Sequence, residues 1–233
     1  MKRLIHISLF SLLFISWCEA HETPSDSSKS ISAVRVNPQA LQIDGLLNED
    51  IWQTAPKSSG FRQNRPDEGE PATERTTIQV CYDDEAIYFG IMCYDSAPDS
   101  IVAPLARKDR WPETDRVVLN IDPFHDHRTG AYFAVGPSSW TGDGVMFKDT
   151  WEDDTWDGVW IAQAAIVDSG WCAEYKIPYH VLRFSAQEQY TWGLNVSRKI
   201  SRKREDVRWQ WKSKSEPGWV SKFGHLNGIT GIQ

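Results

Sequence analysis

Short runs of β-branched and aromatic residues, each bounded by turn-forming residues, recur along the chain from about residue 33 onward. They predict ten strands, over residues 33–37, 41–44, 76–82, 86–95, 116–122, 131–136, 159–167, 171–177, 190–198 and 208–211. No long helical period separates these runs, which argues against a parallel α/β architecture. The pattern therefore predicts an all-β fold, an antiparallel β-sandwich.

Two short segments have helical signals. Asn48 is expected to cap a helix whose first turn carries Glu49 and Asp50, because a side-chain oxygen satisfies free backbone N–H groups and acidic residues suit the helix dipole. This helix would turn Trp52 inward. Pro178 predicts a second helical turn, since proline is favoured at the first helical position. One or two short helices are thus expected beside the strands.

The first twenty residues have the pattern of a secretory signal. Lys2 and Arg3 precede an apolar run, and Cys18-Glu19-Ala20 has the small-residue spacing of a cleavage site. Residues 1–20 are predicted to be a signal peptide, 21–32 a flexible N-terminus and 33–233 one domain. No later segment approaches the ~20 apolar residues of a membrane-spanning helix, so no transmembrane segment is expected after signal removal. The chain is expected to be exported and to be periplasmic, outer-membrane-associated or extracellular.

Composition and missing motifs narrow the function. The net charge of −7 argues against nucleic acid as a partner. Beyond the signal, Cys81, Cys93 and Cys172 cannot all pair, so a disulfide scaffold is not expected. The chain has no Gly-x-Ser-x-Gly, phosphate-binding loop, dinucleotide fingerprint or His-Glu-x-x-His sequence, and we predict no catalytic activity of its own.

Tryptophan is abundant, with twelve residues, and several lie in segments of loop composition: Trp111, Trp140, Trp151, Trp156 and Trp219. An indole near solvent can stack on a flat, half-polar surface such as a sugar ring, although most tryptophans are expected to pack in the core. Segment 110–115 places Trp111, Glu113 and Asp115 just before a predicted strand. It is either a stacking platform with a hydrogen-bonding rim or an indole folded over the sheet edge.

Three polar segments suggest metal sites or solvated turns. In segment 122–128, His125 and His127 with two aspartates allow a zinc site or a polar turn. Segment 151–157 has four carboxylates between two indoles, and it is either a calcium site or a solvated acidic loop. Segment 82–88 predicts a hairpin with solvated carboxylates at its tip.

Taken in order, six segments resemble the family 9 carbohydrate-binding modules (CBM9): residues 43–52, 82–88, 115–122, 171–178, 192–195 and 223–226. The likeness covers most of residues 33–233. Segments 107–109, 156–160 and 182–184 further resemble the version of this module at the N-terminus of larger exported bacterial proteins, in which a β-barrel-like region follows.

The resemblance implies a CBM9/DOMON-like sandwich that clamps a sugar between two tryptophans, here Trp111 and Trp219. It adds Glu113 and Asp115 as candidate acceptors for sugar hydroxyls, and calcium as a structural ion that binding itself does not require. Three polar positions of the family are not kept. A glutamate, an arginine and a glutamine of the pattern are replaced in this chain by Val118, Ala134 and Ser197.

The resulting hypothesis is a secreted, non-catalytic carbohydrate-binding domain that acts in polysaccharide catabolism or uptake, in association with enzymes that hydrolyse O-glycosyl bonds. Its expected partner is an oligo- or polysaccharide, with outer-membrane components as further partners. Two alternatives remain open. One is an outer-membrane interaction module without sugar binding, and the other is a haem-binding sandwich with axial ligands among Met92, Met146, His125 and His180.

Overall fold

The computed structural model of the chain describes residues 28–37 and 41–232. The predicted signal peptide, residues 1–20, lies outside this part, as does most of the predicted flexible segment 21–32. The first strand of the described structure begins at Ser30, three residues before the predicted start of the domain. Within the described residues, no helix is long and apolar enough to cross a membrane.

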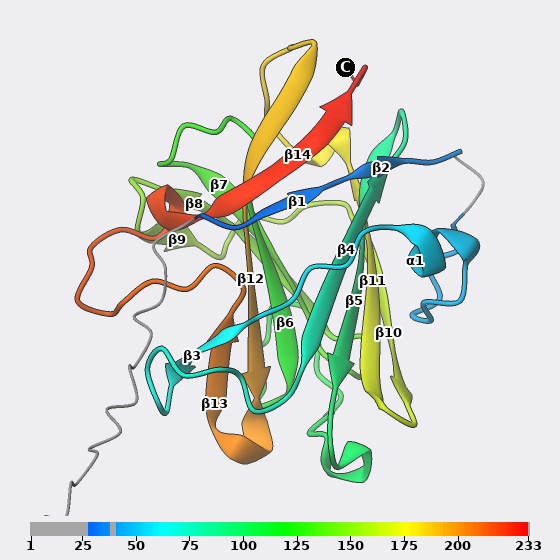
Figure 1. Cartoon of the computed structure of the whole chain (residues 1–233), viewed down its shortest axis with the longest axis vertical. Coiled ribbons are helices and arrows are strands. Elements are labelled where there is room, and N and C mark those ends of the chain that lie inside the picture. Colours follow the sequence, from blue (N-terminus) through cyan, green and yellow to red (C-terminus); the bar gives the residue numbers. More distant parts are fainter. Residues whose placement is uncertain (1–27, 38–40, 233) are drawn as a thin grey trace, which may run out of the picture.

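Two β-sheets face each other in the described part of the chain (Figure 1). Sheet A has nine strands: β1 (Ser30–Ser32), β3 (Arg62–Arg65), β6 (Arg116–Asp122), β7 (Gly130–Val135), β8 (Thr141–Phe147), β9 (Trp151–Asp153), β12 (Gln189–Ile200), β13 (Glu205–Arg208) and β14 (Gly224–Thr230). Sheet B has five: β2 (Val34–Arg35), β4 (Thr76–Tyr82), β5 (Ala86–Tyr94), β10 (Ile161–Val167) and β11 (Gly170–Pro178).

The strand order is β1-β14-β12-β6-β7-β8-β9 in sheet A, with β13 paired to β12 and β3, and β10-β11-β5-β4-β2 in sheet B. Most neighbours are antiparallel, so the predicted sandwich is confirmed. The pairs β1–β14 and β2–β4 are parallel. They arise because the N-terminal segment passes from sheet A to sheet B at Ala33, whose N–H donates to the Asn227 carbonyl.

Helical structure is confined to short pieces: α1 (Asp50–Thr54) and the 3₁₀ turns Pro98–Ser100, Tyr179–Val181, Ser201–Lys203 and Val220–Lys222. The turn predicted at Pro178 is present. The predicted cap of α1 is wrong, because Glu49 and not Asn48 occupies the N-cap position, and its side chain makes no capping hydrogen bond. Tertiary packing of Trp52, which is 1% exposed, holds this single turn in place of a cap.

Several strand boundaries also differ from the prediction. Segment 41–44 is not a strand, and the strand predicted at 208–211 lies instead at 205–208, as β13. Five strands were not predicted: β1, β3, β8, β9 and β14. Two glycines and Asp143 interrupt the apolar pattern of β8, and β9 is short and acidic, so neither has the β-branched alternation that identifies a strand. Cross-strand pairing to β7 supplies what local sequence lacks.

The core lies between the sheets. On β6, Val117, Leu119 and Ile121 are fully buried in it, as successive alternate residues of a strand must be. Arg116, Val118 and Asn120 therefore point to the opposite face of sheet A. Within the described residues, this outer face of sheet A is the surface on which the candidate site lies.

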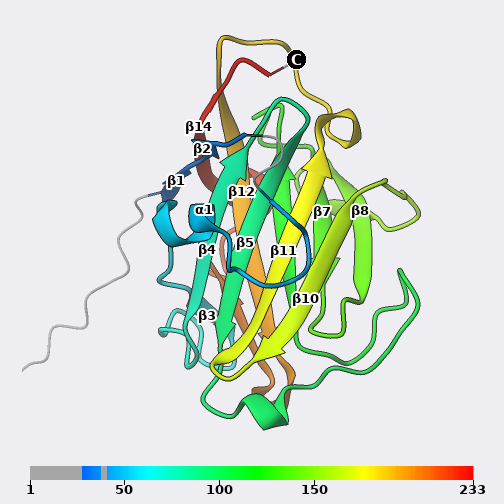
Figure 2. The ribbon, with the colours of Figure 1, turned by 90° about the vertical axis from the view of Figure 1, so that its right-hand side faces the viewer.

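The outer face of sheet B is covered by the chain itself. Residues 36–37 and 41–54 cross it, and Figure 2 shows this part of the chain and α1 in front of β4, β5 and β11. Beneath it, Trp52, Cys81, Ala86 and Tyr88 form a second buried cluster. Sheet B is thus buried on both faces, which explains why its central strands have almost no exposed residue.

The covering segment is fastened by the buried carboxylate of Glu174 on β11. One oxygen accepts from the Asp44 and Gly45 N–H groups at 3.0 and 2.9 Å, and the other accepts from Trp52 Nε1 at 2.8 Å. Gly45 has a φ of +90°, and a Cβ there would lie 2.7 Å from the Ala164 backbone. Only glycine fits this approach without displacing β10.

The predicted hairpin at residues 82–88 is present as the β4–β5 connection. The prediction that all carboxylates at its tip are solvated is wrong for Asp83. Asp83 is 1% exposed and accepts hydrogen bonds from the N–H groups of Glu85 and Ala86 and from the Tyr88 hydroxyl. The tight turn needs this acceptor to satisfy its own backbone donors.

Burial raises the pKa of Glu174 to about 7, against opposing hydrogen bonds from Trp52 and Gly45. Folding then favours the protonated form between about pH 4.5 and 7, so the free energy of unfolding falls as pH rises through this window. Urea unfolding at pH 5, 6, 7 and 8 measures the slope. Glu174→Gln is expected to flatten it, whereas the exposed Glu188→Gln control leaves it unchanged. An identical slope in Glu174→Gln would contradict the assignment.

Candidate functional site

A cavity of about 190 Å³ opens on the outer face of sheet A, and both predicted clamp tryptophans line it. Its full lining is Trp111, Arg116, Val118, Asn120, Tyr132, Glu152, Ser197 and Trp219. Strand register explains the grouping. Val118 on β6 lies opposite Ser197 on β12, and Asn120 lies opposite Tyr132 on β7. Three neighbouring strands thus form the floor, and two loops carry the indoles.

Trp111 is held by the loop that precedes β6. Its ring lies edge-on to Trp140 at 5.0 Å between centroids and tilted to Tyr132 at 6.1 Å. The loop itself is fixed to β8, because Asp109 N–H donates to the Thr141 carbonyl and Trp140 Nε1 donates to the Arg107 carbonyl. Trp111 keeps 40% of its surface exposed. The indole is therefore anchored on one side and open on the other.

Trp219 is held by one carboxylate. Asp149, in the turn between β8 and β9, accepts from the N–H groups of Trp219 and Ser221 at 2.9 Å each, and from the Ser221 hydroxyl at 2.9 Å. Burial alone would raise the pKa of Asp149, but these hydrogen bonds lower it below its ordinary value. Gly218, with a φ of +90°, makes the turn, and a Cβ there would lie 2.4 Å from Ser221 Oγ.

Two larger cavities continue the groove and share Glu152 with the first. One, of about 570 Å³, is lined by four cationic residues and that single carboxylate, in the set Asn64, Arg65, Thr150, Glu152, Ser197, Arg208, Lys212, Lys214, Gly218 and Trp219. The other, of about 360 Å³, is lined by Trp111, Tyr132, Glu152 and Asp154. The groove is therefore electrostatically polarised, with a basic end and an acidic end.

An arginine accompanies each clamp indole. The Arg208 guanidinium lies 4.4 Å from the Trp219 ring centroid, and that of Arg116 lies 5.5 Å from the Trp111 centroid, both within cation–π range. Burial lowers the pKa of each guanidinium, against the attraction of Asp206. In the part of the chain that the structure describes, neither side chain makes a hydrogen bond or an ion pair.

Glu152 is the acidic counterpart of these arginines. Desolvation in the groove, together with the neighbouring Asp154, raises its pKa above the ordinary range. Its partner in the β8–β9 pairing is Met146, which places the carboxylate on the same face of sheet A as Tyr132. A group at this position can accept hydrogen bonds from ligand hydroxyls.

Glu113 and Asp115 lie away from the residues that line the cavity. The Glu113 side chain is 74% exposed and forms an ion pair with Lys199, whose charge lowers the pKa of the carboxyl. Asp115 is fully buried, and one oxygen accepts from the Ser201 N–H at 3.0 Å. Burial raises its pKa. In this geometry Asp115 fixes the start of β6, and the two carboxylates do not meet the indoles in one cavity.

The family positions named from the resemblance do fall at the groove. Val118 and Ser197 line the cavity, and Ala134 lies beside Val118 on β7. Sequence reasoning missed Arg116, Arg208, Tyr132, Glu152 and Asn120, which supply the polar groups. Alternation along the predicted strand 116–122 places Arg116 and Asn120 on one face, but nothing local indicated that this face is the open one.

The other tryptophans of loop composition divide between core and surface. Trp140 is 3% exposed, contrary to the expectation of a surface position, because its indole packs under Trp111. Trp156 is half-buried beside Phe133. Trp151 is 63% exposed but does not line the three cavities of the groove.

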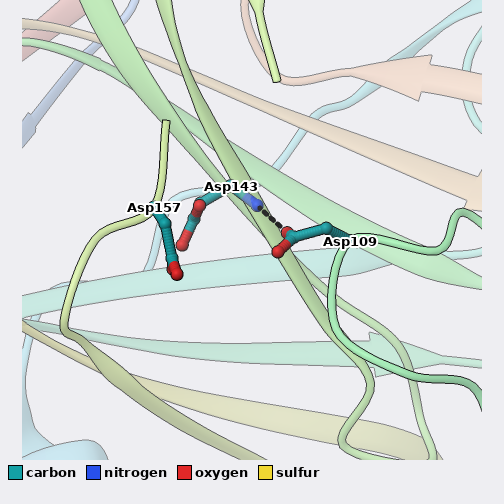
Figure 3. Close-up of side chains that lie close together, drawn as sticks. All are labelled: Asp109, Asp143 and Asp157. Atoms are coloured by element: carbon teal, nitrogen blue, oxygen red, sulfur yellow. Dashed lines mark hydrogen bonds between the residues drawn. The ribbon is translucent and has the colours of Figure 1, made fainter. Parts of the chain in front are cut away.

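The acidic segment 151–157 does not converge on one point. Instead, three carboxylates from separate loops and β8 approach one another, with oxygens within 4.8 Å: Asp109, Asp143 and Asp157 (Figure 3). Lys108 Nζ lies 3.0 Å from Asp143 Oδ2 and also pairs with Asp157. The Lys108 ammonium thus bridges two of the carboxylates and offsets one of the three negative charges of the cluster.

The histidine segment forms a turn. Asp122 accepts from the His127 N–H at 2.9 Å, and Asp126 accepts from the N–H groups of Arg128 and Thr129. The His125 ring lies near those of His127 and His225, at 4.5 and 5.3 Å between centroids. Among the described residues, the Asp109 cluster is the one group of three or more whose ligand atoms all lie within 4.8 Å.

The haem candidates are spread over the molecule. Met146 lines an apolar cavity of about 300 Å³ beside Phe124, and His180 lines a different one beside Tyr179. Met92 is on β5 in sheet B. These side chains do not flank a common slot.

No family model matches the chain, and no curated protein matches it. Solved structures do match over 87% of the chain. Two are complexes of a family 9 carbohydrate-binding module from Caldicellulosiruptor kristjanssonii, one with cellotriose and one with glucose. Both have 16% identity and a TM-score of 0.62, with 95% and 97% of that chain covered. A third, from Bacteroides uniformis ATCC 8492, is a protein whose suggested role is carbohydrate binding, with 13% identity, a TM-score of 0.67 and full coverage (100%).

These likenesses define the class of the fold, a β-sandwich of the kind found in carbohydrate-binding modules. More particularly, the chain has a CBM9-like fold. The resemblance predicted from the six ordered segments is confirmed at the level of fold.

Removing the Asp149 carboxylate is expected to loosen the loop that carries Trp219. Asp149→Ala leaves two backbone N–H groups and one hydroxyl without their acceptor, which typically costs about 1–3 kcal/mol locally. Amide hydrogen exchange over residues 216–222 should accelerate by tenfold or more. Asp149 has a φ of 71°, which asparagine also tolerates. Asp149→Asn keeps one acceptor oxygen as well, so it should have a smaller effect. Unchanged exchange in Asp149→Ala would show that the loop is held by other contacts.

Chelation is expected to leave the thermal midpoint of the protein unchanged, because the Lys108 ammonium already bridges Asp143 and Asp157. Lys108→Gln should lower the free energy of unfolding by about 1–3 kcal/mol, since it leaves the buried Asp143 without its cation. Differential scanning calorimetry with and without EDTA measures both effects. Oδ1 of Asp143 lacks a partner among the described residues. A fall of several degrees on chelation of the unmutated protein would therefore identify a bound ion there.

Proposed function

We propose that this chain is a non-catalytic carbohydrate-binding domain that holds a saccharide in the groove between Trp111 and Trp219. The observation that carries the proposal is that these two indoles, 108 residues apart in sequence, line one cavity on the open face of sheet A. Structures of the same fold, under 20% identical, are complexes with cellotriose and glucose. A pyranose ring has the apolar faces and polar rim that such a cavity accommodates.

The surrounding groups suit recognition more than catalysis. Asn120, Tyr132, Glu152 and Ser197 offer amide, hydroxyl and carboxylate groups to sugar hydroxyls. Hydrolysis of a glycosidic bond would need two carboxyl groups placed on opposite sides of that bond. Glu152 and Asp154 lie together at the acidic end, and the basic end has no second carboxylate in its lining. The proposed role is therefore to hold a glycan, not to cleave it.

The wider setting of this role follows from the sequence. We propose an exported domain that acts in polysaccharide catabolism or uptake beside enzymes that hydrolyse O-glycosyl bonds. Support comes from the signal-like residues 1–20 and from the likeness to modules of larger exported proteins. In this proposal Glu113 and Asp115 do not bind sugar hydroxyls. They hold the loop that carries Trp111, through contacts with Lys199 and Ser201 respectively.

Truncation of either clamp indole is expected to abolish most saccharide affinity. A stacked aromatic ring contributes on the order of 1 kcal/mol or more, so Trp111→Ala and Trp219→Ala should each weaken binding about tenfold. Isothermal titration calorimetry against a panel of neutral and acidic oligosaccharides measures the change. Trp151→Ala, which removes an exposed indole that does not line the groove, is the matched control.

Two results would overturn the proposal. One is the absence of binding to every saccharide in the panel by a protein whose circular dichroism shows it to be folded. The other is binding that the double variant Trp111→Ala/Trp219→Ala leaves unchanged. Retention of the chain by outer-membrane fractions free of glycan, combined with the first result, would favour the interaction module in its place.

A further inference from the structure

We infer that the saccharide this groove selects is acidic, a glycan of uronic acid units whose carboxylates bind Arg116 and Arg208. This inference rests on the proposed function, since it names the ligand class of the same groove. It starts from a contrast in charge. The chain as a whole has a net charge of −7, yet the 570 Å³ cavity beside Trp219 is lined by four cationic residues and one carboxylate.

Most cations at this end of the groove already have partners. Arg65 forms an ion pair with Asp206 at 2.7 Å, and Lys214 lies 3.7 Å from a Glu68 oxygen. Lys212 donates to the carbonyls of Ser213 and Glu216. These three side chains are fixed by the protein itself.

Arg116 and Arg208 differ from the other cations. Both are half-buried, and across residues 28–37 and 41–232 the structure gives neither guanidinium a hydrogen bond or an ion pair. Asp206 attracts both groups, and Glu113 also attracts Arg116, but from beyond ion-pair distance. A partly desolvated guanidinium without a carboxylate in direct contact is costly for the protein alone. Two such groups in one groove indicate that the missing partner is an anion supplied by the ligand.

The stacking geometry indicates how that anion is met. Each guanidinium lies over an indole, Arg116 on Trp111 and Arg208 on Trp219. A cation–π contact leaves the N–H groups of a guanidinium free to donate, and these groups can match a carboxylate in a bidentate pair. The indole simultaneously orients the arginine and presents an apolar surface. A sugar ring that carries its own carboxylate satisfies both elements at once.

The departures from the family pattern agree with this reading. Val118 and Ser197 stand where the resemblance implied a glutamate and a glutamine, and Ala134 stands where it implied an arginine. The floor of the groove therefore has fewer side chains that can bind neutral hydroxyls, while Arg116 and Arg208 give the groove positive charge. A groove built in this way gains its discrimination from ion pairing more than from hydroxyl contacts.

The test compares an acidic trisaccharide with its neutral methyl ester and with a neutral trisaccharide of another sugar. Calorimetry of the unmutated chain is performed with trigalacturonate, with its methyl ester and with cellotriose. We expect the acid to bind at least tenfold more tightly than the ester, and its affinity to fall in 0.5 M NaCl because salt screens the pair. A sulfated oligosaccharide and tricarballylate, a tricarboxylate that is not a sugar, complete the panel.

Arginine variants assign the effect to residues. Arg116→Gln and Arg208→Gln should each reduce affinity for the acid about tenfold more than they reduce affinity for the ester. Arg208→Lys keeps the positive charge but loses the bidentate geometry of the guanidinium. Its affinity for the acid should lie between that of the unmutated chain and that of Arg208→Gln. Arg183→Gln, an exposed arginine outside the groove, should change nothing.

The outcomes separate the two proposals. Binding of the ester or of cellotriose as tightly as the acid would overturn the inference and leave saccharide binding intact. Equal binding of tricarballylate would reduce the site to an anion site, and tighter binding of the sulfated sugar would reject the carboxylate assignment. If no saccharide of any charge binds, the proposed function itself fails.

Discussion

The buried carboxylate of Glu174 is the contact on which the arrangement of the sandwich depends. It draws the Asp44-Gly45 backbone and the Trp52 indole onto β11, from positions more than 120 residues away. With that segment in place, sheet B is covered on its outer face, and its strands are buried on both sides. The carboxylate accepts hydrogen bonds from three N–H groups, and these directional contacts fix the position of the covering segment, which hydrophobic contact alone would not do.

The same contact determines where a ligand can bind. Because residues 36–37 and 41–54 occupy the outer face of sheet B, the large open face of the described structure is that of sheet A. The central strands of sheet A alternate core residues with polar ones. The two walls of the groove are built differently. One indole is fixed to β8 through a network of aromatic and backbone contacts, whereas the other depends on a single aspartate in a turn.

The fold class was predictable because apolar alternation and turn residues are local signals, and the order of six segments identified the CBM9-like fold. Glu174 shows why: the Asp44-Gly45, Trp52 and Glu174 positions recur together in the resemblance, and they meet in space. The sequence did not allow us to predict which arginines form ion pairs within the protein. Whether Arg116 or Arg208 is free depends on how Asp206 and Arg65 pair across β13 and β3, which is a property of sheet register. The burial of Asp115 likewise depends on the distant Ser201 backbone.

The parallel pairing of β1 with β14 imposes an order on folding. These strands lie at opposite ends of the described chain, with Ser30 beside His225, so their pairing requires the largest loop closure in the molecule. Until β14 docks, residues 189–194 of β12 form an unpaired edge at the centre of sheet A. An unpaired edge of this kind invites pairing with another chain. A folding chain therefore passes through an aggregation-prone stage that ends only when β14 has docked on β12.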